Sequence, residues 1–199
     1  MIPRRAAALV RDTSGATIVE FALVLPVLLL TLLGLFDLGY NMYTAQMLQG
    51  AIQNAARLST LQGASDKQAG IDAVVTRAVH AVVPNATLGF NRKAYASFSD
   101  VARPEDFTDI NANGTCDAGE PFEDANANGT WDADAGSDGF GGARDAVLYT
   151  VTVNYPRAFP VARLIPGQSD HLALTAVTVL RNQPFNIQNA PAATTGNCA

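Results

Sequence analysis

The fold of this chain is decided by the stretch Ile18-Val-Glu-Phe-Ala-Leu-Val-Leu-Pro-Val-Leu-Leu-Leu-Thr-Leu-Leu-Gly-Leu-Phe36. This apolar run has 19 residues, close to the roughly 20 that an α-helix needs to cross a bilayer. Arg4, Arg5 and Arg11 precede the run, and Asp37 closes it. Because basic residues stay on the cytoplasmic side, we expect the N-terminus in the cytoplasm and the chain after Asp37 outside the inner membrane.

A secretory signal peptide and a buried core helix both fit the apolar run less well than a membrane span does. A signal peptide has a shorter apolar core and is followed by a small-x-small cleavage site, whereas this run is followed by Asp37-Leu-Gly-Tyr40. A buried core helix does not account for arginines on one flank only. We therefore expect a membrane-spanning helix, in which Pro26 produces a mild kink.

The 199-residue chain is weakly acidic, with 13 basic and 18 acidic side chains and a formal charge of −5. A nucleic-acid-binding protein normally has a basic face, so no nucleic-acid partner is expected. The two cysteines and two histidines form no zinc site or Cys/His nucleophile pattern. No phosphate-binding loop is present either, so we expect neither enzyme activity nor a small-molecule substrate.

Helical periodicity continues beyond the apolar run. Apolar residues at three- and four-residue steps predict one helix from the membrane to about Thr60. A second helix is expected from Asp66 to about Val82, with Ser65 as its N-cap. His80 on that helix is expected to be structural, because no second metal ligand is spaced with it.

Strand patterns occupy the rest of the apolar sequence. Residues 86–100 are expected to contain one or two short strands. The segments 146–155 and 171–181 alternate in side-chain character, and we expect them to pair as antiparallel strands. The tail after Phe185 is polar, and we expect it to be flexible.

The charge is concentrated between Asp100 and Asp145, where 12 acidic residues accompany 2 basic ones. This segment contains a repeat whose first copy fits the twelve-residue calcium loop of EF-hand proteins. Gly114 supplies its sharp turn, and Pro121 directly after it argues against an EF-hand helix. The expected calcium ligands of this copy are Asp109, Asn111, Asn113, the backbone carbonyl of Thr115, Asp117 and Glu120.

A second copy of the loop follows fifteen residues later, with Asp124, Asn126, Asn128, Thr130 and Asp132 as its expected ligands. Ala135 stands where the last ligand, a glutamate, is required. This copy therefore either takes a carboxylate from Glu123, Asp134 or Asp138 or binds calcium weakly. The alternative for both copies is a solvated insert with ordinary turn chemistry. The register of the repeat and its negative charge favour structural calcium, because so little apolar sequence cannot fold by burial.

Two cysteines lie far apart in the sequence. Cys116 occupies a non-ligand position of the first loop, and Cys198 is the penultimate residue. Outside the cytoplasm they can form a disulfide that pins the tail to the loop. Two free thiols and an intermolecular bond stay open as alternatives, because the sequence does not give the Cα separation that a disulfide requires.

A glycine five residues before Glu20 adds a further meaning to the N-terminal segment. The basic leader, Gly15, four residues and then Glu20 at the start of the apolar helix resemble a type IV prepilin cleavage site. The stretch Gly15-Ala-Thr-Ile-Val-Glu-Phe-Ala-Leu-Val-Leu-Pro26 resembles the start of TadE-like proteins of the tight-adherence (Tad/Flp) pilus system. The segments 151–156 and 174–185 resemble TadE-like C-termini.

The resemblance implies a set of roles for the N-terminal residues. A prepilin peptidase cuts after Gly15, Ala16 becomes the new N-terminus, and its α-amino group pairs with Glu20 of an adjacent subunit. Pairing the two charges offsets the cost of desolvating both. Many pilins begin with a methylated phenylalanine, and Ala16 departs from that pattern.

The sequence therefore predicts an α+β protein: a single N-terminal transmembrane helix that continues as a pilin-like long helix, then a small antiparallel sheet with an inserted acidic calcium-type loop. The expected segments are a basic leader (1–15), the transmembrane helix (16–36), extramembrane helices (37–83), short strands and a loop (84–108), the calcium-type insert (109–142), antiparallel strands (143–185) and a flexible tail (186–199).

The resemblance implies a non-catalytic TadE-like minor pilin or pseudopilin that helps initiate or assemble a type IVb Tad/Flp pilus and so supports cell adhesion. Its expected partners are the inner membrane, other pilins or pseudopilins, and a prepilin peptidase. The alternative is an uncleaved single-span membrane anchor with a calcium-binding periplasmic adhesion or assembly module.

Overall fold

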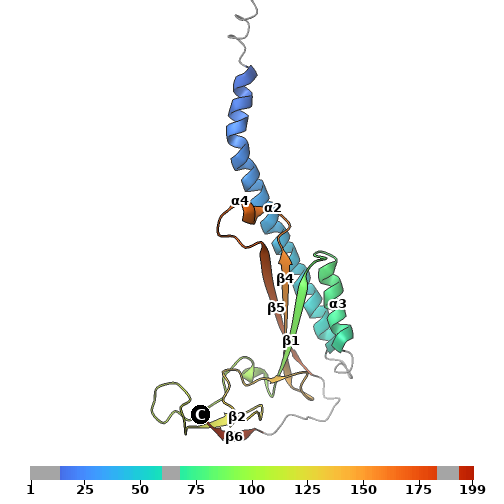
Figure 1. Ribbon diagram of the computed structural model, residues 1–199. Helices are drawn as coiled ribbons and strands as arrows, with labels where there is room; N and C mark the ends of the chain where they lie inside the picture. The colour runs from blue at the N-terminus through green and yellow to red at the C-terminus, as the bar shows by residue number, and fades with distance from the viewer. Residues whose placement is uncertain (1–13, 60–67, 183–192) are drawn as a thin grey trace, which may run out of the picture. The chain divides into compact units, whose positions relative to one another are not determined.

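The computed structural model describes residues 14–59, 68–182 and 193–199 of the chain. Figure 1 shows their helices and strands. The chain divides into two compact units. The first unit joins Met1–Tyr43 to Pro156–Leu172, and the second joins Thr44–Tyr155 to Ala173–Ala199. The predicted leader up to residue 13, the predicted N-cap Ser65 and tail residues 186–192 lie outside the described residues.

The longest element is helix α2, Ser14–Ser59, which confirms the single long helix that the periodicity predicts. Pro26 lies inside this helix without ending it. The apolar run is unburied on every side, as Leu23 (74% exposed) and Phe36 (60% exposed) illustrate. A helix that is apolar all round is suited to lipid rather than to water. Among the described residues α2 is the one helix long and apolar enough to cross a membrane.

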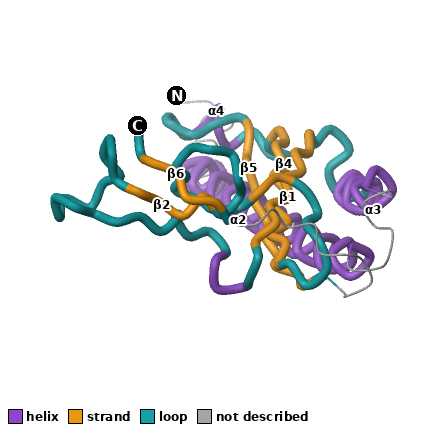
Figure 2. The backbone as a smooth tube through the Cα atoms, turned by 90° about the horizontal axis from the view of Figure 1, so that it is seen from below, coloured by secondary structure: helices purple, strands orange, loops and turns teal. Residues whose placement is uncertain are grey.

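In the second unit the last turns of α2 and helix α3, Gln68–His80, form a helical layer. The two helices lie side by side in both views (Figures 1 and 2). Ile52 and Val75 are completely buried, because each belongs to the apolar stripe of its helix. His80 ends α3, and its Nε2 lies 2.9 Å from the carbonyl oxygen of Ala86, which is a structural role.

A four-stranded sheet with the order β3-β1-β4-β5 forms the second layer. Strand β1 pairs antiparallel with β4, in a register that runs from Thr87↔Asn154 to Tyr95↔Ala146. The predicted strands at 146–155 and 171–181 are confirmed as the neighbours β4 and β5. The bounds of the four strands are β1, Thr87–Tyr95; β3, Ser137–Asp138; β4, Ala146–Pro156; and β5, His171–Arg181.

Strand β4 supplies the centre of the core. Val147, Tyr149, Val151 and Val153 are each at most 3% exposed, as the alternating pattern predicts. Strand β3 belongs to the acidic insert, yet it pairs with β1, so the insert is attached to the main sheet rather than separate from it. The predicted short strands after residue 84 are one strand, β1, followed by the 3-10 helix η2, Phe98–Asp100.

A buried arginine joins the sheet to the helical layer. Arg92 of β1 forms an ion pair with Asp72 of α3. Its guanidinium lies 4.1 Å from the ring centre of Tyr149 and 4.8 Å from that of Phe140. The Tyr149 hydroxyl donates a hydrogen bond to Asp72 at 2.8 Å. Burial and then this hydrogen bond raise the pKa of Tyr149 above its ordinary value.

A second sheet has two strands, β2 (Pro121–Asp124) and β6 (Thr194–Asn197), paired antiparallel. The flexible tail predicted over 186–199 is therefore wrong for residues 194–197. Backbone pairing with β2 orders this polar segment without requiring an apolar face. Sequence patterns did not reveal it, because the segment has no strand alternation of its own.

The short helix α4, Val161–Leu164, belongs to the first unit. It lies in the connection between β4 and β5 and is seen beside α2 (Figure 1). Its Val161 is 7% exposed, whereas Leu164 is 48% exposed.

Candidate functional site

The predicted cleavage and docking residues lie at the start of α2. Gly15 is in the first turn of α2, and apart from its chain neighbours and the backbone of its own helix no described atom lies within 4 Å of the position that a Cβ would occupy. Ala16 follows in the same helix, and Glu20 is exposed at the start of the apolar run. A carboxylate in lipid costs up to about 3 kcal/mol at the bilayer centre and less near the interface. A positive charge close to Glu20 would offset part of this cost.

The first acidic loop is closed by its own polar side chains. Asp109 accepts hydrogen bonds from the backbone N–H groups of Asn113 at 3.2 Å and Gly114 at 2.8 Å. Asp117 Oδ2 accepts from the side-chain amides of Asn111 at 2.8 Å and Asn113 at 2.6 Å. The amide of Asn111 and then that of Asn113 lower the pKa of Asp117 below its ordinary value. Gly114 has a φ of 80°, which favours glycine at this turn.

The second loop repeats these contacts one for one. Asp124 accepts from the N–H groups of Asn128 at 3.0 Å and Gly129 at 2.8 Å. Asp132 Oδ2 accepts from the side-chain amides of Asn126 at 2.9 Å and Asn128 at 2.6 Å. Gly129 has a φ of 83°, close to that of its counterpart. The two copies share one backbone conformation as well as one sequence pattern.

Both loops present an all-oxygen set of potential ligands, which is the chemistry that calcium prefers. Thr115 and Thr130 lie at matching places, and each donates its N–H at 2.8 Å to the asparagine two residues earlier. Among the described residues, no three Asp, Glu, His or Cys side chains converge as a ready metal cage. The carboxylates are held instead by amide and N–H donors, so an ion would have to replace some of these hydrogen bonds.

Glu105 supplies the second loop with the carboxylate that its own sequence lacks. Its two oxygens accept from the N–H groups of Ala125 at 2.9 Å and Asp132 at 3.0 Å. Glu120 makes the equivalent pair of bonds to the first loop, at 2.8 and 3.0 Å. The N–H of each glutamate also donates to its loop, Glu105 to the Asp132 carbonyl and Glu120 to the Asp117 carbonyl, both at 3.0 Å.

Glu105 is a further candidate for the missing carboxylate, beside the three that the sequence offers. Glu123 is exposed on β2, and Asp138 lies in β3 opposite Lys93. Asp134 is engaged elsewhere, since it forms an ion pair with Lys93 at 2.7 Å and accepts from the Tyr95 hydroxyl at 2.8 Å. Burial opposes ionisation of Asp134, but the bonds from Lys93 and Tyr95 outweigh it and lower its pKa.

A sequence signal for Glu105 exists. The repeat extends four residues upstream of each loop, so that Glu105-Asp-Phe-Thr-Asp109 corresponds to Glu120-Pro-Phe-Glu-Asp124. The two upstream segments lie antiparallel, with Phe107 bridged to Phe122. Because the two equivalent segments pair antiparallel, Glu105 of the first segment reaches the second loop and Glu120 of the second segment reaches the first loop. Glu105 and Glu120 are 2% and 4% exposed, so both carboxylates are buried by this exchange.

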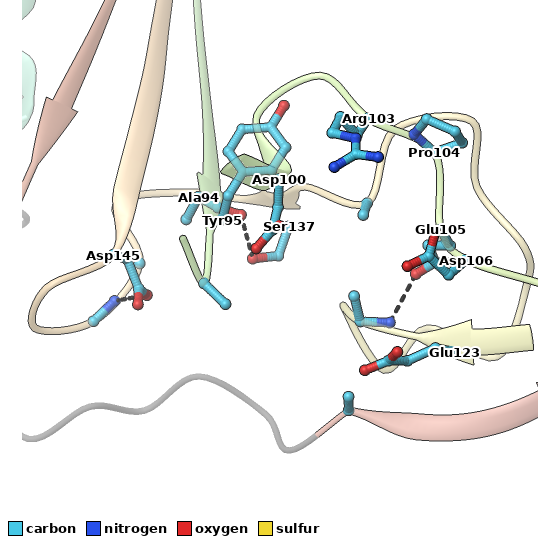
Figure 3. Close-up of a pocket in the computed structure, with 16 residues that line it drawn as sticks. Ala94, Tyr95, Asp100, Arg103, Pro104, Glu105, Asp106, Glu123, Ser137 and Asp145 are labelled. Atoms are coloured by element: carbon cyan, nitrogen blue, oxygen red, sulfur yellow. Dashed lines mark hydrogen bonds between the residues drawn. The ribbon is translucent and has the colours of Figure 1, made fainter. Parts of the chain in front are cut away.

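A cavity of about 270 Å³ lies beside Glu105. Figure 3 shows Tyr95 and Asp145 on one side of it and Arg103, Glu105 and Glu123 on the other. Its charged lining is mainly acidic. Asp145 is 3% exposed and accepts a hydrogen bond from the backbone of the loop before β4, which makes it part of the fold.

The structure joins Cys116 and Cys198 in a disulfide, with their Cα atoms 5.6 Å apart. The backbone reinforces the link, because the N–H of Cys198 donates to the Glu120 carbonyl at 2.8 Å and its carbonyl accepts from Gly119 at 3.1 Å. The C-terminal tail is thereby fixed to the end of the first loop. Neither cysteine remains free for an intermolecular bond.

Comparison with known proteins assigns the N-terminal part of the chain. The family model for TadE-like proteins matches residues 15–57. Residues 15–57 form a TadE-like segment. The match begins at Gly15 and covers the apolar run and most of α2. No curated protein and no solved structure matches the chain.

The TadE-like match associates the chain with assembly of the Tad pilus. Proteins of this family are structural and assembly components rather than enzymes, and they act together with other Tad pilus proteins. The exposed apolar helix agrees with a membrane-anchored component of that system. The acidic insert lies outside the matched residues, so its chemistry has to be argued from its own contacts.

Proposed function

We propose that the protein is a TadE-like minor pilin or pseudopilin that takes part in initiating or assembling a type IVb Tad/Flp pilus. The observation that carries the proposal is the matched segment 15–57, which coincides with a single helix whose exposed first part bears Gly15 and Glu20. The protein works without catalysis, as a subunit whose helix docks among other pilin helices. Its localisation is the inner membrane, with the N-terminus cytoplasmic and the sheet-bearing unit periplasmic.

Glu20 guides the docking step in this proposal. The exposed apolar surface from Ile18 to Phe36 offers packing to neighbouring helices but no register along their length. One charge on that surface selects the position at which it meets an opposite charge. After removal of residues 1–15, the α-amino group of Ala16 in a neighbouring subunit provides such a charge, and both groups avoid an unpaired state in lipid.

A pair of variants in the native host tests the role of Glu20. Glu20→Ala is expected to insert in the membrane at normal levels and to abolish or strongly reduce piliation. Glu123→Ala, which removes an exposed acid outside the matched segment, serves as the control and is expected to leave piliation unchanged. Normal piliation with Glu20→Ala would refute the docking role.

Intact mass of the protein purified from its native membrane tests the processing step. A mass that lacks residues 1–15 is expected, with Ala16 as the new N-terminus. A full-length chain would instead support the second candidate, an uncleaved membrane anchor that carries a calcium-binding module.

The second candidate rests on the paired acidic loops. The two loops have matching hydrogen bonds, and each is bonded to a buried glutamate; we propose that they bind structural Ca²⁺. Residues Asp109, Asn111, Asn113, Asp117 and Glu120 would hold one ion. Their counterparts Asp124, Asn126, Asn128 and Asp132, together with Glu105, would hold the other. Bound calcium supplies positive charge to a segment that otherwise repels itself.

Calorimetric titration of the full-length protein in detergent tests this module. Two calcium ions per chain are expected for the unaltered protein. Asp109→Asn is expected to lose one of them and Asp124→Asn the other, because these residues hold matching places in the two loops. Extracellular calcium sites have dissociation constants up to about 10⁻³ M. Absence of binding heat up to millimolar calcium would therefore refute the calcium proposal.

A further inference from the structure

The connection between β4 and β5, residues 157–170, is bonded to α2 by an ion pair. Arg157 forms an ion pair with Asp37, and the two side chains are only 13% and 7% exposed. The same guanidinium donates to the Ser169 carbonyl at 2.8 Å and to Gln168 Oε1 at 3.1 Å. Arg157 therefore binds the beginning of the connection, its end and the helix together. All of these residues belong to the first compact unit.

Aromatic rings make a second contact at the same level. The ring of Phe159 stacks on Phe36 with centroids 6.1 Å apart and meets Tyr40 edge-on at 6.5 Å. Figure 1 shows α4, which follows Phe159 in this connection, beside α2. Because a helix rises about 1.5 Å per residue, Phe36 to Tyr40 spans about 6 Å of the α2 axis. The connection is thus attached to α2 within a narrow band.

That band coincides with the end of the apolar run. At about 1.5 Å per residue, the run from Ile18 to Phe36 is about 28 Å long, against roughly 30 Å for the hydrocarbon core of a bilayer. Phe36 ends the run, and Asp37 is the first charged residue after Glu20. In the proposed function, where α2 spans the bilayer, the attachment point therefore lies at the membrane–water boundary, where aromatic side chains accumulate in membrane proteins.

The outward side of the connection has the chemistry of an interfacial element. Leu164 is 48% exposed and Ile165 is 42% exposed. Arg163 is exposed next to them, and Val161 faces inward at 7% exposure. Two aliphatic side chains beside a cation match the headgroup region of a phospholipid bilayer, into which apolar faces of interfacial elements enter by about 5–10 Å.

We propose that the β4–β5 connection is a lipid-contacting element, in which Leu164 and Ile165 enter the outer leaflet and Arg163 meets lipid phosphate groups. The proposal rests on the membrane-spanning role of α2 in the proposed function. In this proposal the Arg157–Asp37 ion pair holds the connection at the depth of the membrane–water boundary. The experiment must distinguish contact with lipid from coverage of the same residues by a second protein chain.

Nitroxide labelling measures the depth of these residues directly. Both native cysteines are in the disulfide, so a single introduced cysteine carries the label. The full-length protein with Leu164→Cys is placed in vesicles of phosphatidylethanolamine and phosphatidylglycerol. Collisions of the label with oxygen, which concentrates in lipid, are compared with collisions with a water-soluble nickel chelate. Leu29→Cys in the apolar run and Phe98→Cys, an exposed apolar site in η2, provide the two references.

The oxygen-to-nickel ratio at position 164 is expected to lie above that at 98 and below that at 29. An Arg157→Gln change is expected to bring the ratio at 164 down towards that at 98. A ratio at 164 as low as that at 98, together with a high ratio at 29, would overturn the proposal but would still support the membrane helix. A ratio at 29 as low as that at 98 would refute the membrane-spanning role of α2. Shielding of 164 from both reagents would identify a protein partner and also overturn the proposal.

Discussion

Replacement of Glu105 by glutamine tests the exchange of glutamates between the two loops. The carboxylate accepts two backbone hydrogen bonds, from Ala125 at 2.9 Å and from Asp132 at 3.0 Å, and Glu105 is 2% exposed. Glutamine keeps one acceptor oxygen and turns an NH₂ group towards the other N–H. A hydrogen bond to a charged group contributes about 1.5–3 kcal/mol. Loss of one such bond and neutralisation of the other lowers the free energy of unfolding by about 2–4 kcal/mol.

The single tryptophan of the chain reports this change without a label. Trp131 lies in the second loop, donates its indole N–H to the Glu105 carbonyl at 2.9 Å and meets Phe107 edge-on at 5.7 Å. Urea unfolding of the full-length protein in detergent is followed by Trp131 fluorescence, first with a chelator. Repetition with calcium measures the added stability, which grows with ligand concentration over Kd. Glu105→Gln is expected to gain less stability from calcium than the unaltered protein.

Glu123→Gln is the matched control, because Glu123 is also an acid of the insert but is exposed on β2. Surface changes of this kind usually stay within about 0.5 kcal/mol. Equal unfolding free energies for Glu105→Gln and Glu123→Gln would refute the assignment of Glu105 to the second loop. A loss in calcium-dependent stability for Glu123→Gln alone would point to Glu123 as the ligand instead.

Three further measurements test the remaining structure. Val151→Ala empties a completely buried position of β4 and is expected to cost about 2–3 kcal/mol in the same unfolding assay; a cost below about 1 kcal/mol would contradict the core assignment. Cys198→Ser opens a link spanning 82 residues, which is expected to cost about 4 kcal/mol; equal stability of the oxidised and reduced protein would count against it. Burial and then the Asp134 hydrogen bond raise the pKa of Tyr95 from 10.0 to about 12. The stability that this provides is complete below pH 10 and is lost as the pH rises through 12. Because the pKa of Tyr149 is also raised, ultraviolet titration should show more than one late phenolate transition, and Tyr95→Phe should remove one of them.

The elements with strong local patterns could be predicted from the sequence. The apolar run and the three- and four-residue spacing predict α2 to within a residue of its end, since helices form from local contacts. The alternation in 146–155 predicts the buried face of β4, because a strand places every second side chain on one side. The Asp-x-Asn-x-Asn-Gly repeat predicts both loops, since their conformation depends on side chains bonding to neighbouring N–H groups.

Long-range pairing was beyond the reach of such patterns. Strand β6 has no apolar alternation, and its order comes from β2 and from the disulfide. The hydrogen bonds of Glu105 to the second loop depend on which segments lie antiparallel. Of the acids that the sequence offered for this place (Glu123, Asp134 and Asp138), Asp134 is bonded instead to Lys93 and Tyr95. Composition and spacing describe what each segment can do but not which partner it meets.

By itself the sequence determined a long apolar helix, a strand-forming C-terminal part and two oxygen-rich loops, because each of these follows from interactions between residues close in the chain. Only the tertiary structure decided that Glu105 completes the second loop and that Arg157 ties the β4–β5 connection to Asp37. Each of these two contacts joins residues that are far apart in the chain. Their formation depends on how the elements are brought together, and no local periodicity records that arrangement.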